Sequence, residues 1–173
     1  YERLFNFREI RYFDIEGKLT GLKSKAMTSP CGKIRIPINE SQDDRSQIEE
    51  YLREYHGEGI QHIALFTDDI YASVDALRAN GIEFQDTPDT YYEMLPDRIG
   101  TIKEDYKAIQ ELGILVDKDD EGYLLQIFTR PIQDRPTMFI EIIQRHGSQS
   151  FGKGNFKALF VSIEQEQALR GNL

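Results

Sequence analysis

Alternating apolar and polar residues predict three strands in the first third of the chain. These strands are expected over residues 8–16, 21–28 and 33–39, with turn residues between them. Pro37 lies opposite the isoleucine face of the third segment, and a proline inside a strand favours an edge position or a bulge. The region therefore predicts a small meander of three strands.

The spacing of apolar residues changes to the helical period in the middle of the chain. Helices are expected over residues 46–55, 70–80, 91–99 and 103–112. A nearly continuous apolar run predicts a strand over residues 60–66, and residues 82–84 are expected to form a brief strand. Gly81 and Gly113 follow helical segments, as is typical of residues that end a helix.

The last third returns to strands and closes with a helix. Strands are expected over residues 114–117, 123–129 and 137–144, followed by a polar, glycine-containing loop over 147–154 and a helix over 155–169. The later part of the chain thus reads as one β-α-β-β-β unit, and the first part reads as the same unit without its opening strand. The repeat predicts an α+β fold in which two modules pack around a shared cavity.

The expected boundaries follow from this repeat. Residues 1–45 are assigned to the remainder of the first module, 46–59 to a connecting helix and turn, 60–145 to the second module, and 146–173 to a closing loop and C-terminal helix. The first residue is a tyrosine inside an amphipathic run rather than an initiator methionine. This start favours a fragment of a longer protein, with the missing strand upstream.

Composition narrows the class of partner. The chain has 173 residues, with 21 lysines and arginines against 30 aspartates and glutamates, a net charge of −9. Such an acidic chain argues against nucleic acid as a partner, because phosphate binding requires clustered cations. No apolar run approaches the length of a membrane helix, and the single cysteine, Cys31, excludes an internal disulfide. We therefore expect a cytoplasmic protein that does not bind membranes.

His62 is the most informative of the three histidines, because it lies inside the apolar segment 60–66. Neutral imidazole is the commonest metal ligand among the side chains. The alternative is a core residue that hydrogen-bonds a neighbouring carbonyl group. Taken alone, the position favours the core interpretation.

Glu141 lies in the segment FIEII (139–143), which is apolar on both sides of the glutamate. An ionised carboxylate buried there would cost several kcal/mol unless a cation or a metal ion paired with it. The alternative is an edge strand that turns Glu141 to water. Because the neighbours are apolar on both faces, the pattern favours the buried interpretation.

Together, His62 and Glu141 supply an imidazole and a carboxylate from equivalent strands of one module. Non-heme iron oxygenases hold Fe(II) with two histidines and one carboxylate, which leaves positions open for substrate and dioxygen. His56 and His146 lie outside the apolar strands and are expected at the surface. The second histidine is therefore expected from the opening strand of the first module, which would precede Tyr1.

Two glutamines lie in or beside apolar strands. Gln61 adjoins His62, and Gln126 lies within the apolar segment 124–128. Buried amides need hydrogen-bond partners, and ordinary sheet bonding explains them as readily as a polar site does. The segment FGKGNF (151–156) lacks the spacing of a phosphate-binding loop, and its glycines and aromatic residues suit a loop that closes over a ring.

Several segments of the chain resemble the 4-hydroxyphenylpyruvate dioxygenase family and occur in that family's order. They are GEGIQHIA (57–64), GILVD (113–117), LLQIFT (124–129), DRPT (134–137), FIEIIQR (139–145) and FGKGNF (151–156). The similarity covers essentially all 173 residues. It corresponds to the catalytic C-terminal half of the family, truncated at its N-terminal side. It implies the vicinal-oxygen-chelate fold, in which paired β-α-β-β-β modules form an open barrel around iron.

The resemblance also implies roles for particular residues. His62 and Glu141 would be two of the three Fe(II) ligands, and the family's first histidine would lie before this chain begins. The polar residues implied in catalysis are Ser24, Asn39, Gln61 and Gln126. The residues implied in substrate binding are Gln47, Phe128, Phe139, Phe151 and Phe156.

The reaction implied by the resemblance converts 4-hydroxyphenylpyruvate and dioxygen to homogentisate and carbon dioxide, a step of tyrosine catabolism. A homo-oligomer is expected for the full-length parent, and the isolated fragment is expected to be inactive. Two alternatives remain open. One is hydroxymandelate synthase, which hydroxylates the benzylic carbon of the same substrate. The other is a non-catalytic domain that binds an aromatic ligand.

Overall fold

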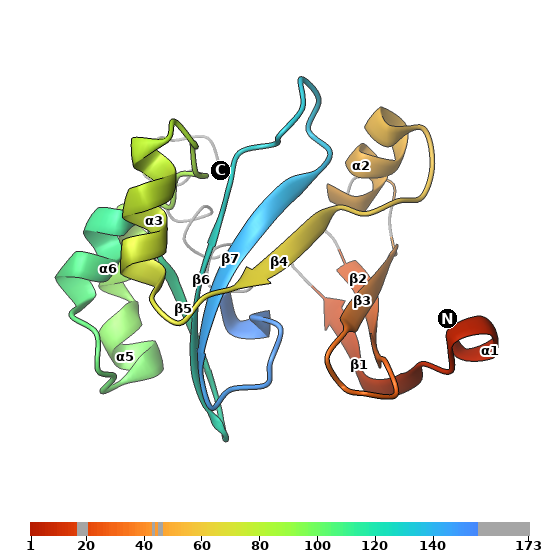
Figure 1. Ribbon diagram of the computed structural model, residues 1–173, viewed down its shortest axis with the longest axis horizontal. Coiled ribbons are helices and arrows are strands. Elements are labelled where there is room, and N and C mark those ends of the chain that lie inside the picture. Colours follow the sequence, from red (N-terminus) through yellow and green to blue (C-terminus); the bar gives the residue numbers. More distant parts are fainter. Residues whose placement is uncertain (17–20, 43, 45–46, 156–173) are drawn as a thin grey trace. The chain divides into compact units, whose positions relative to one another are not determined.

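The computed structural model describes residues 1–16, 21–42, 44 and 47–155 (Figure 1). The chain divides into two compact units, Tyr1–Gly59 and Ile60–Leu173. Within the described ranges, no helix is both long enough and apolar enough to cross a membrane.

The first unit contains one antiparallel sheet, and one helix precedes and one helix follows its strands in the sequence. Its elements are α1 (Glu2–Phe5), β1 (Arg8–Glu16), β2 (Gly21–Thr28), β3 (Arg35–Ser41) and α2 (Gln47–Tyr55). The strands form a meander in the order β1-β2-β3, which confirms the sequence prediction. Pro37 of β3 pairs with Ala26 of β2. β3 is an edge strand of this sheet, where a residue without an N–H group is tolerated.

The second unit contains a four-stranded sheet and a layer of helices. Its elements are β4 (His62–Phe66), α3 (Ile70–Ala79), α4 (Asp89–Glu93), α5 (Leu95–Ile99), α6 (Tyr106–Leu112), β5 (Leu115–Asp119), β6 (Gly122–Phe128) and β7 (Phe139–His146). The strand order is β4-β7-β6-β5, with β4 parallel to β7 and the other pairs antiparallel. This β-α-β-β-β arrangement confirms the predicted α+β fold. The described strands form two separate sheets rather than one closed barrel.

The hydrophobic core of the second unit lies between the sheet and its helices. Figure 1 shows α3, α5 and α6 together on one side of this sheet. Side chains alternate along each strand, so one face of the sheet is apolar and packs on the helices. This core includes Ile70, Val74, Tyr91, Leu95, Ile109, Val116, Leu125, Ile127 and Ile142.

The helix predicted over residues 91–99 is instead two short helices, α4 and α5, that meet at Met94. Pro96 lies in the first turn of α5. It has no N–H group to bond the carbonyl of Tyr92, so a continuous helix would lose a bond at this point. The prediction was wrong because it followed apolar spacing and gave too little weight to the proline.

Two other predicted elements differ from the structure. The helix predicted from residue 103 begins at Tyr106, because the Asp105 side chain caps it by accepting hydrogen bonds from the N–H groups of Lys107 and Ala108. Residues 82–84 form an isolated bridge from Phe84 to Thr129 rather than a strand. The helix predicted over residues 155–169 lies outside the described residues apart from its first position.

Candidate metal centre

His62 and Glu141 lie on neighbouring strands of the four-stranded sheet. β4 and β7 run parallel, and their register places His62 beside Phe139 and Ala64 beside Glu141. His62 and Glu141 therefore project from the same face of the sheet, the face opposite the helices. Their side chains converge, with His62 Nε2 3.4 Å from Glu141 Oε2.

The Glu141 carboxylate is buried. Its side chain is 10% exposed, against 29% for His62, and the adjacent Ile142 belongs to the core on the other face. A carboxylate removed from water needs hydrogen-bond donors or a compensating positive charge. In the described part of the chain its ion-pair partner is His62. The position therefore calls for a cation, either an imidazolium or a metal ion.

Gln61 orients the His62 ring. The Nδ1 atom of His62 lies 3.1 Å from Gln61 Oε1, which is an acceptor, so the proton belongs on Nδ1. In the neutral ring, the Nε2 lone pair then faces the Glu141 carboxylate. Two electron-pair donors that face each other at this distance suit adjacent ligands of one metal ion.

Fe(II) fits this nitrogen and oxygen donor set, which would supply two ligands of a three-ligand arrangement. Within the described ranges, no group of three or more histidine, cysteine, aspartate or glutamate side chains is placed to hold a metal ion. A third side-chain ligand would therefore come from outside those ranges.

Two aromatic rings form an apolar wall beside the polar pair. Phe139 stacks on the His62 ring with a centroid distance of 5.0 Å and an interplanar angle of 10°. Phe128 lies edge-on to Phe139 at 5.8 Å and to His62 at 6.3 Å, and it pairs with Glu141 in register. The wall shields one side of the imidazole and carboxylate from water.

Gln126 extends the polar surface along β6. Its side chain shares the face of Phe128, it is 3% exposed, and its Oε1 atom has no hydrogen-bond partner in the described structure. An unsatisfied buried acceptor costs about 1–3 kcal/mol, which is tolerated more readily where a ligand supplies the missing donor. Oε1 is thus a buried acceptor for which the described residues supply no donor.

The backbone of residue 152 approaches this amide closely. A Cβ atom at Gly152 would lie 2.6 Å from Gln126 Oε1, and the residue has a φ of +76°, which favours glycine. Both features favour glycine at position 152, and the absence of a side chain there lets the backbone lie directly over Gln126. We call residues 147–155 the closing segment.

The closing segment is anchored on β5 by two aspartates. The Gly154 N–H group donates to Asp117 Oδ2 at 2.9 Å, and the Ser148 hydroxyl donates to Asp119 Oδ2 at 2.6 Å. Burial raises the pKa of Asp117, although the Gly154 N–H group opposes the shift. Burial also acts on the pKa of Asp119, but hydrogen bonds led by the Ser148 hydroxyl outweigh it and lower that pKa. Sequence reasoning missed both anchors, because their role depends on which loop lies against β5.

The remaining residues predicted at the site are distributed over both units. Ser24 is buried and pairs in register with Asn39, which is exposed, and Gln47 begins α2; all three belong to the first unit. Phe151 is half-buried in the closing segment. Phe156 lies outside the described residues. Roles for these residues at a substrate remain predictions.

His146 is not the simple surface residue that the sequence predicted. Its Nε2 atom lies 3.0 Å from Glu104 Oε1, its side chain is 23% exposed, and its ring stacks on Tyr123 at 4.6 Å. Residues 141 and 146 are an odd number of positions apart on β7, so His146 projects from the helix-covered face, away from Glu141. The alternation along the strand was a signal that could have excluded it as the partner of His62. His56 is exposed, as predicted.

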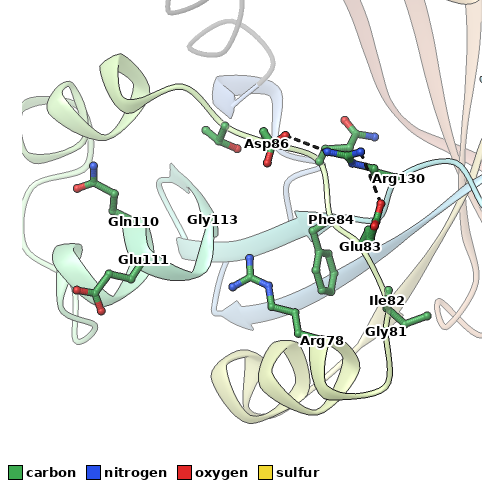
Figure 2. A pocket seen from close by; sticks show the side chains of 12 residues that line it. Arg78, Gly81, Ile82, Glu83, Phe84, Asp86, Gln110, Glu111, Gly113 and Arg130 are labelled. Atoms are coloured by element: carbon green, nitrogen blue, oxygen red, sulfur yellow. Dashed lines mark hydrogen bonds and ion pairs between the residues drawn. The ribbon is translucent and has the colours of Figure 1, made fainter.

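A separate groove of about 560 Å³ lies on the helix side of the second unit (Figure 2). Its lining includes Arg78, Glu83, Phe84, Asp86 and Arg130. The guanidinium groups already have partners, because Arg130 pairs with both acids and Arg78 donates to the carbonyl of residue 112. Both guanidinium groups of the groove therefore have partners, unlike Gln126 Oε1 on the face with Glu141, which has none among the described residues.

Comparison with known proteins gives a consistent result for this chain. Residues 1–127 match the Glyoxalase/Bleomycin resistance protein/Dioxygenase superfamily. The chain is 65% identical over 173 residues to 4-hydroxyphenylpyruvate dioxygenase from Pseudomonas aeruginosa, covering 99% of the chain and 48% of that protein. It is 62% identical over 175 residues to hemolysin VllY from Vibrio vulnificus, covering 100% of the chain and 48% of that protein. The chain thus spans about half the length of these curated relatives.

A solved structure is also similar. A triple mutant of 4-hydroxymandelate synthase from Streptomyces coelicolor superposes with a TM-score of 0.83 at 36% sequence identity. The match covers 96% of this chain and 48% of that structure. Almost the whole length of this chain therefore shares its backbone fold with about half of that solved protein.

Proposed function

Because the chain belongs to the Glyoxalase/Bleomycin resistance protein/Dioxygenase superfamily, we propose that it carries the metal-binding face of an Fe(II)-dependent dioxygenase. The proposed reaction converts 4-hydroxyphenylpyruvate and dioxygen to homogentisate and carbon dioxide, in tyrosine catabolism. The 65% identity to a protein named 4-hydroxyphenylpyruvate dioxygenase supports this substrate.

One observation carries the proposal. His62 Nε2 and Glu141 Oε2 converge to 3.4 Å on the face opposite the helices, and the carboxylate is buried. A domain that only bound an aromatic ligand would have no need to keep a carboxylate in this position, since an unpaired buried charge is destabilising. The arrangement is explained if the two groups hold a cation that takes part in the reaction.

Residues of the chain would bind and orient the metal and the substrate. Fe(II), when bound, supplies coordination positions for the 2-oxo acid and dioxygen and the redox chemistry of the reaction. His62 and Glu141 would hold it, and Gln61 keeps the Nδ1 proton of His62 in place so that Nε2 remains a ligand. The carboxylate charge offsets part of the charge of the ion.

The same face would bind the aromatic ring of the substrate. Phe128 and Phe139 supply apolar surface beside the metal ligands, and Gln126 supplies a buried acceptor for a substrate hydroxyl group. The closing segment, with Phe151, would exclude water from the ring. Phe156, Ser24, Asn39 and Gln47 are proposed to complete the substrate pocket.

The proposal is tested in the full-length protein by measuring bound Fe(II), oxygen uptake and homogentisate. We expect His62→Ala and Glu141→Ala to lose bound iron and turnover while the circular dichroism spectrum is retained. The matched control is His56→Asn, which removes an exposed imidazole at a residue with φ of 61° that asparagine tolerates. Wild-type iron content in either site variant would remove that residue from the metal centre.

Hydroxymandelate synthase is the second candidate, supported by the structural match with a TM-score of 0.83. It would use the same substrate and the same two ligands, but its product carries the new hydroxyl group on the benzylic carbon. Product identification by chromatography and mass spectrometry separates the two, because only one of them yields homogentisate. Hydroxymandelate as the main product would overturn the first choice.

Three further proposals depend on this assignment. We propose that the third iron ligand is a histidine outside this chain, so the isolated 173-residue chain should form little or no homogentisate. We also place the full-length protein in the cytoplasm and propose that it is a homo-oligomer. Substantial homogentisate formation by the isolated chain would exclude an external third ligand.

A further inference from the structure

A hydrogen-bond network at the edge of the four-stranded sheet is not used by the site described above. Tyr91 of α4 is fully buried, and its hydroxyl accepts a hydrogen bond from the Val116 N–H group at 2.8 Å. The same hydroxyl lies 2.6 Å from Asn155 Oδ1 and 3.1 Å from the Val116 carbonyl oxygen. It has a single proton, and the shorter distance assigns that proton to Asn155. Burial raises the pKa of Tyr91, which keeps the hydroxyl protonated as a donor.

Arg98 of α5 joins the same network. Its Nη2 atom lies 2.6 Å from the Val116 carbonyl oxygen, 2.8 Å from the Tyr91 hydroxyl and 3.0 Å from Asn155 Oδ1. The guanidinium group also lies over the Tyr91 ring, 5.1 Å from its centroid. Two helices on one side of the sheet therefore direct their polar groups to the backbone of an edge strand and to one asparagine.

Asn155 connects this network to the site face. It is 1% exposed and ends the described part of the closing segment, whose residue 152 lies against Gln126 and whose residue 154 bonds Asp117. The chain thus passes from the site face to the β5 edge, where the helix layer holds it. The side chains that hold it come from helices on the opposite face.

We propose that Tyr91, Arg98 and Asn155 form a latch that holds the closing segment over the metal and aromatic face. They are positioning residues for the aromatic substrate and do not touch it. The inference rests on the proposed function for its substrate, but the latch itself is a statement about the segment. Loss of the latch should release the segment, weaken substrate binding and admit water.

The hydrogen-bonding pattern of Asn155 supplies a discriminating variant. Oδ1 accepts from both Tyr91 and Arg98, whereas Nδ2 is buried without a partner in the described structure, as are Nε and Nη1 of Arg98. The latch therefore uses only the acceptor of Asn155. Asn155→Asp keeps that acceptor and adds a charge that Arg98 can neutralise, whereas Asn155→Leu has similar size and no acceptor.

The first test measures amide hydrogen exchange in the full-length protein. We expect Asn155→Leu and Tyr91→Phe to accelerate exchange at Gly154 by about tenfold or more, while amides in the centre of β6 keep their protection. Asn155→Asp should behave like wild type. The control is Gln149→Ala, which changes an exposed residue of the same segment. Equal acceleration throughout the sheet, or none at Gly154, would overturn the latch.

The second test measures kinetics with 4-hydroxyphenylpyruvate. We expect Asn155→Leu to lower kcat/KM by about tenfold, mainly through KM, and Asn155→Asp to restore it. An active wild-type enzyme with unchanged KM in Asn155→Leu would overturn the positioning role. A wild-type enzyme that forms no homogentisate would instead refute the proposed function, and the exchange measurements would still decide the latch.

Discussion

On the face of the four-stranded sheet that lies opposite the helices, the carboxylates at the two ends have different partners. At the β5 end, Asp117 and Asp119 accept hydrogen bonds from N–H and hydroxyl groups of the closing segment. At the other end, formed by β4 and β7, Glu141 is buried to a similar degree as Asp117 but faces the imidazole of His62. The aspartates at the β5 end accept hydrogen bonds from the chain itself, whereas among the described residues the ion-pair partner of Glu141 is His62.

This difference separates a structural role from a binding role on one surface. Carboxylates that accept hydrogen bonds from the closing segment fix that segment, and we expect the removal of one such bond to leave the metal ligands in place. A buried carboxylate beside a neutral imidazole, with Gln126 Oε1 nearby and unpaired among the described residues, leaves electron pairs that an added cation and ligand can use. The contrast predicts effects of different size at the two ends.

The largest effect is expected for Glu141→Gln in the full-length protein. Loss of a charged ligand should lower Fe(II) affinity by more than about a hundredfold, since changes in residues that only support a ligand already cost 10–100-fold. Asp117→Asn keeps an acceptor for the Gly154 N–H group and should change the affinity less than about threefold. Metal titration by calorimetry measures both. Equal losses of Fe(II) affinity in the two variants would contradict the separation of a metal-binding end from a structural end.

A smaller effect is expected for Gln61→Leu. The variant removes the acceptor that holds the Nδ1 proton of His62, so the ring would lose its preferred tautomer and orientation. Fe(II) affinity should fall by about 10–100-fold. The control is Gln149→Leu, at an exposed position of the closing segment. Unchanged affinity in Gln61→Leu would mean that Gln61 does not orient the ligand.

Gly152→Ala should destabilise the protein by more than about 1 kcal/mol, because it adds strain at a positive φ and a clash with the amide of Gln126. Gly81→Ala is the matched control, since its φ is +83° but its Cβ would meet nothing within 4 Å. The difference between their midpoints in chemical denaturation isolates the contact with Gln126. Equal midpoints would show that the closing segment does not press on this residue.

The smallest effect concerns pH. Burial raises the pKa of Asp117 above 3.8, so its ionisation in the folded state opposes folding, and its contribution to stability falls as the pH rises from about 4 through the folded-state pKa. The pKa of Asp119 lies below 3.8, because the hydrogen bonds led by the Ser148 hydroxyl outweigh desolvation. The contribution of Asp119 to stability is therefore present above about pH 4 and is lost as the pH falls through the lowered pKa. Carboxyl ¹³C titration by NMR measures both. Asp117 titrating below Asp119 would contradict the assignment.

Much of the fold followed from local patterns. The three strands of the first unit and the β-α-β-β-β order of the second were predicted from alternation and turn residues. Local reasoning failed where one residue or one distant partner overrode the pattern. Pro96 divided a helix, and Phe84 met Thr129 through a single bridge instead of a strand.

The candidate site was predictable only in part. His62 and Glu141 were singled out because a polar, potentially charged group inside an apolar strand requires a partner. That argument says nothing about which residues surround them. The anchor at Asp117 and the pairing of His146 with Glu104 come from contacts between segments that are far apart in the sequence.

The sequence by itself determined which segments become strands and helices and which residue types require compensation, since hydrophobic periodicity and the cost of buried charge act locally. Only the tertiary structure decided which groups supply that compensation. Strand register brought an imidazole to Glu141, and the path of the closing segment brought Asn155 to Tyr91. Register and loop path depend on the packing of the whole unit, so no single stretch of sequence contains them.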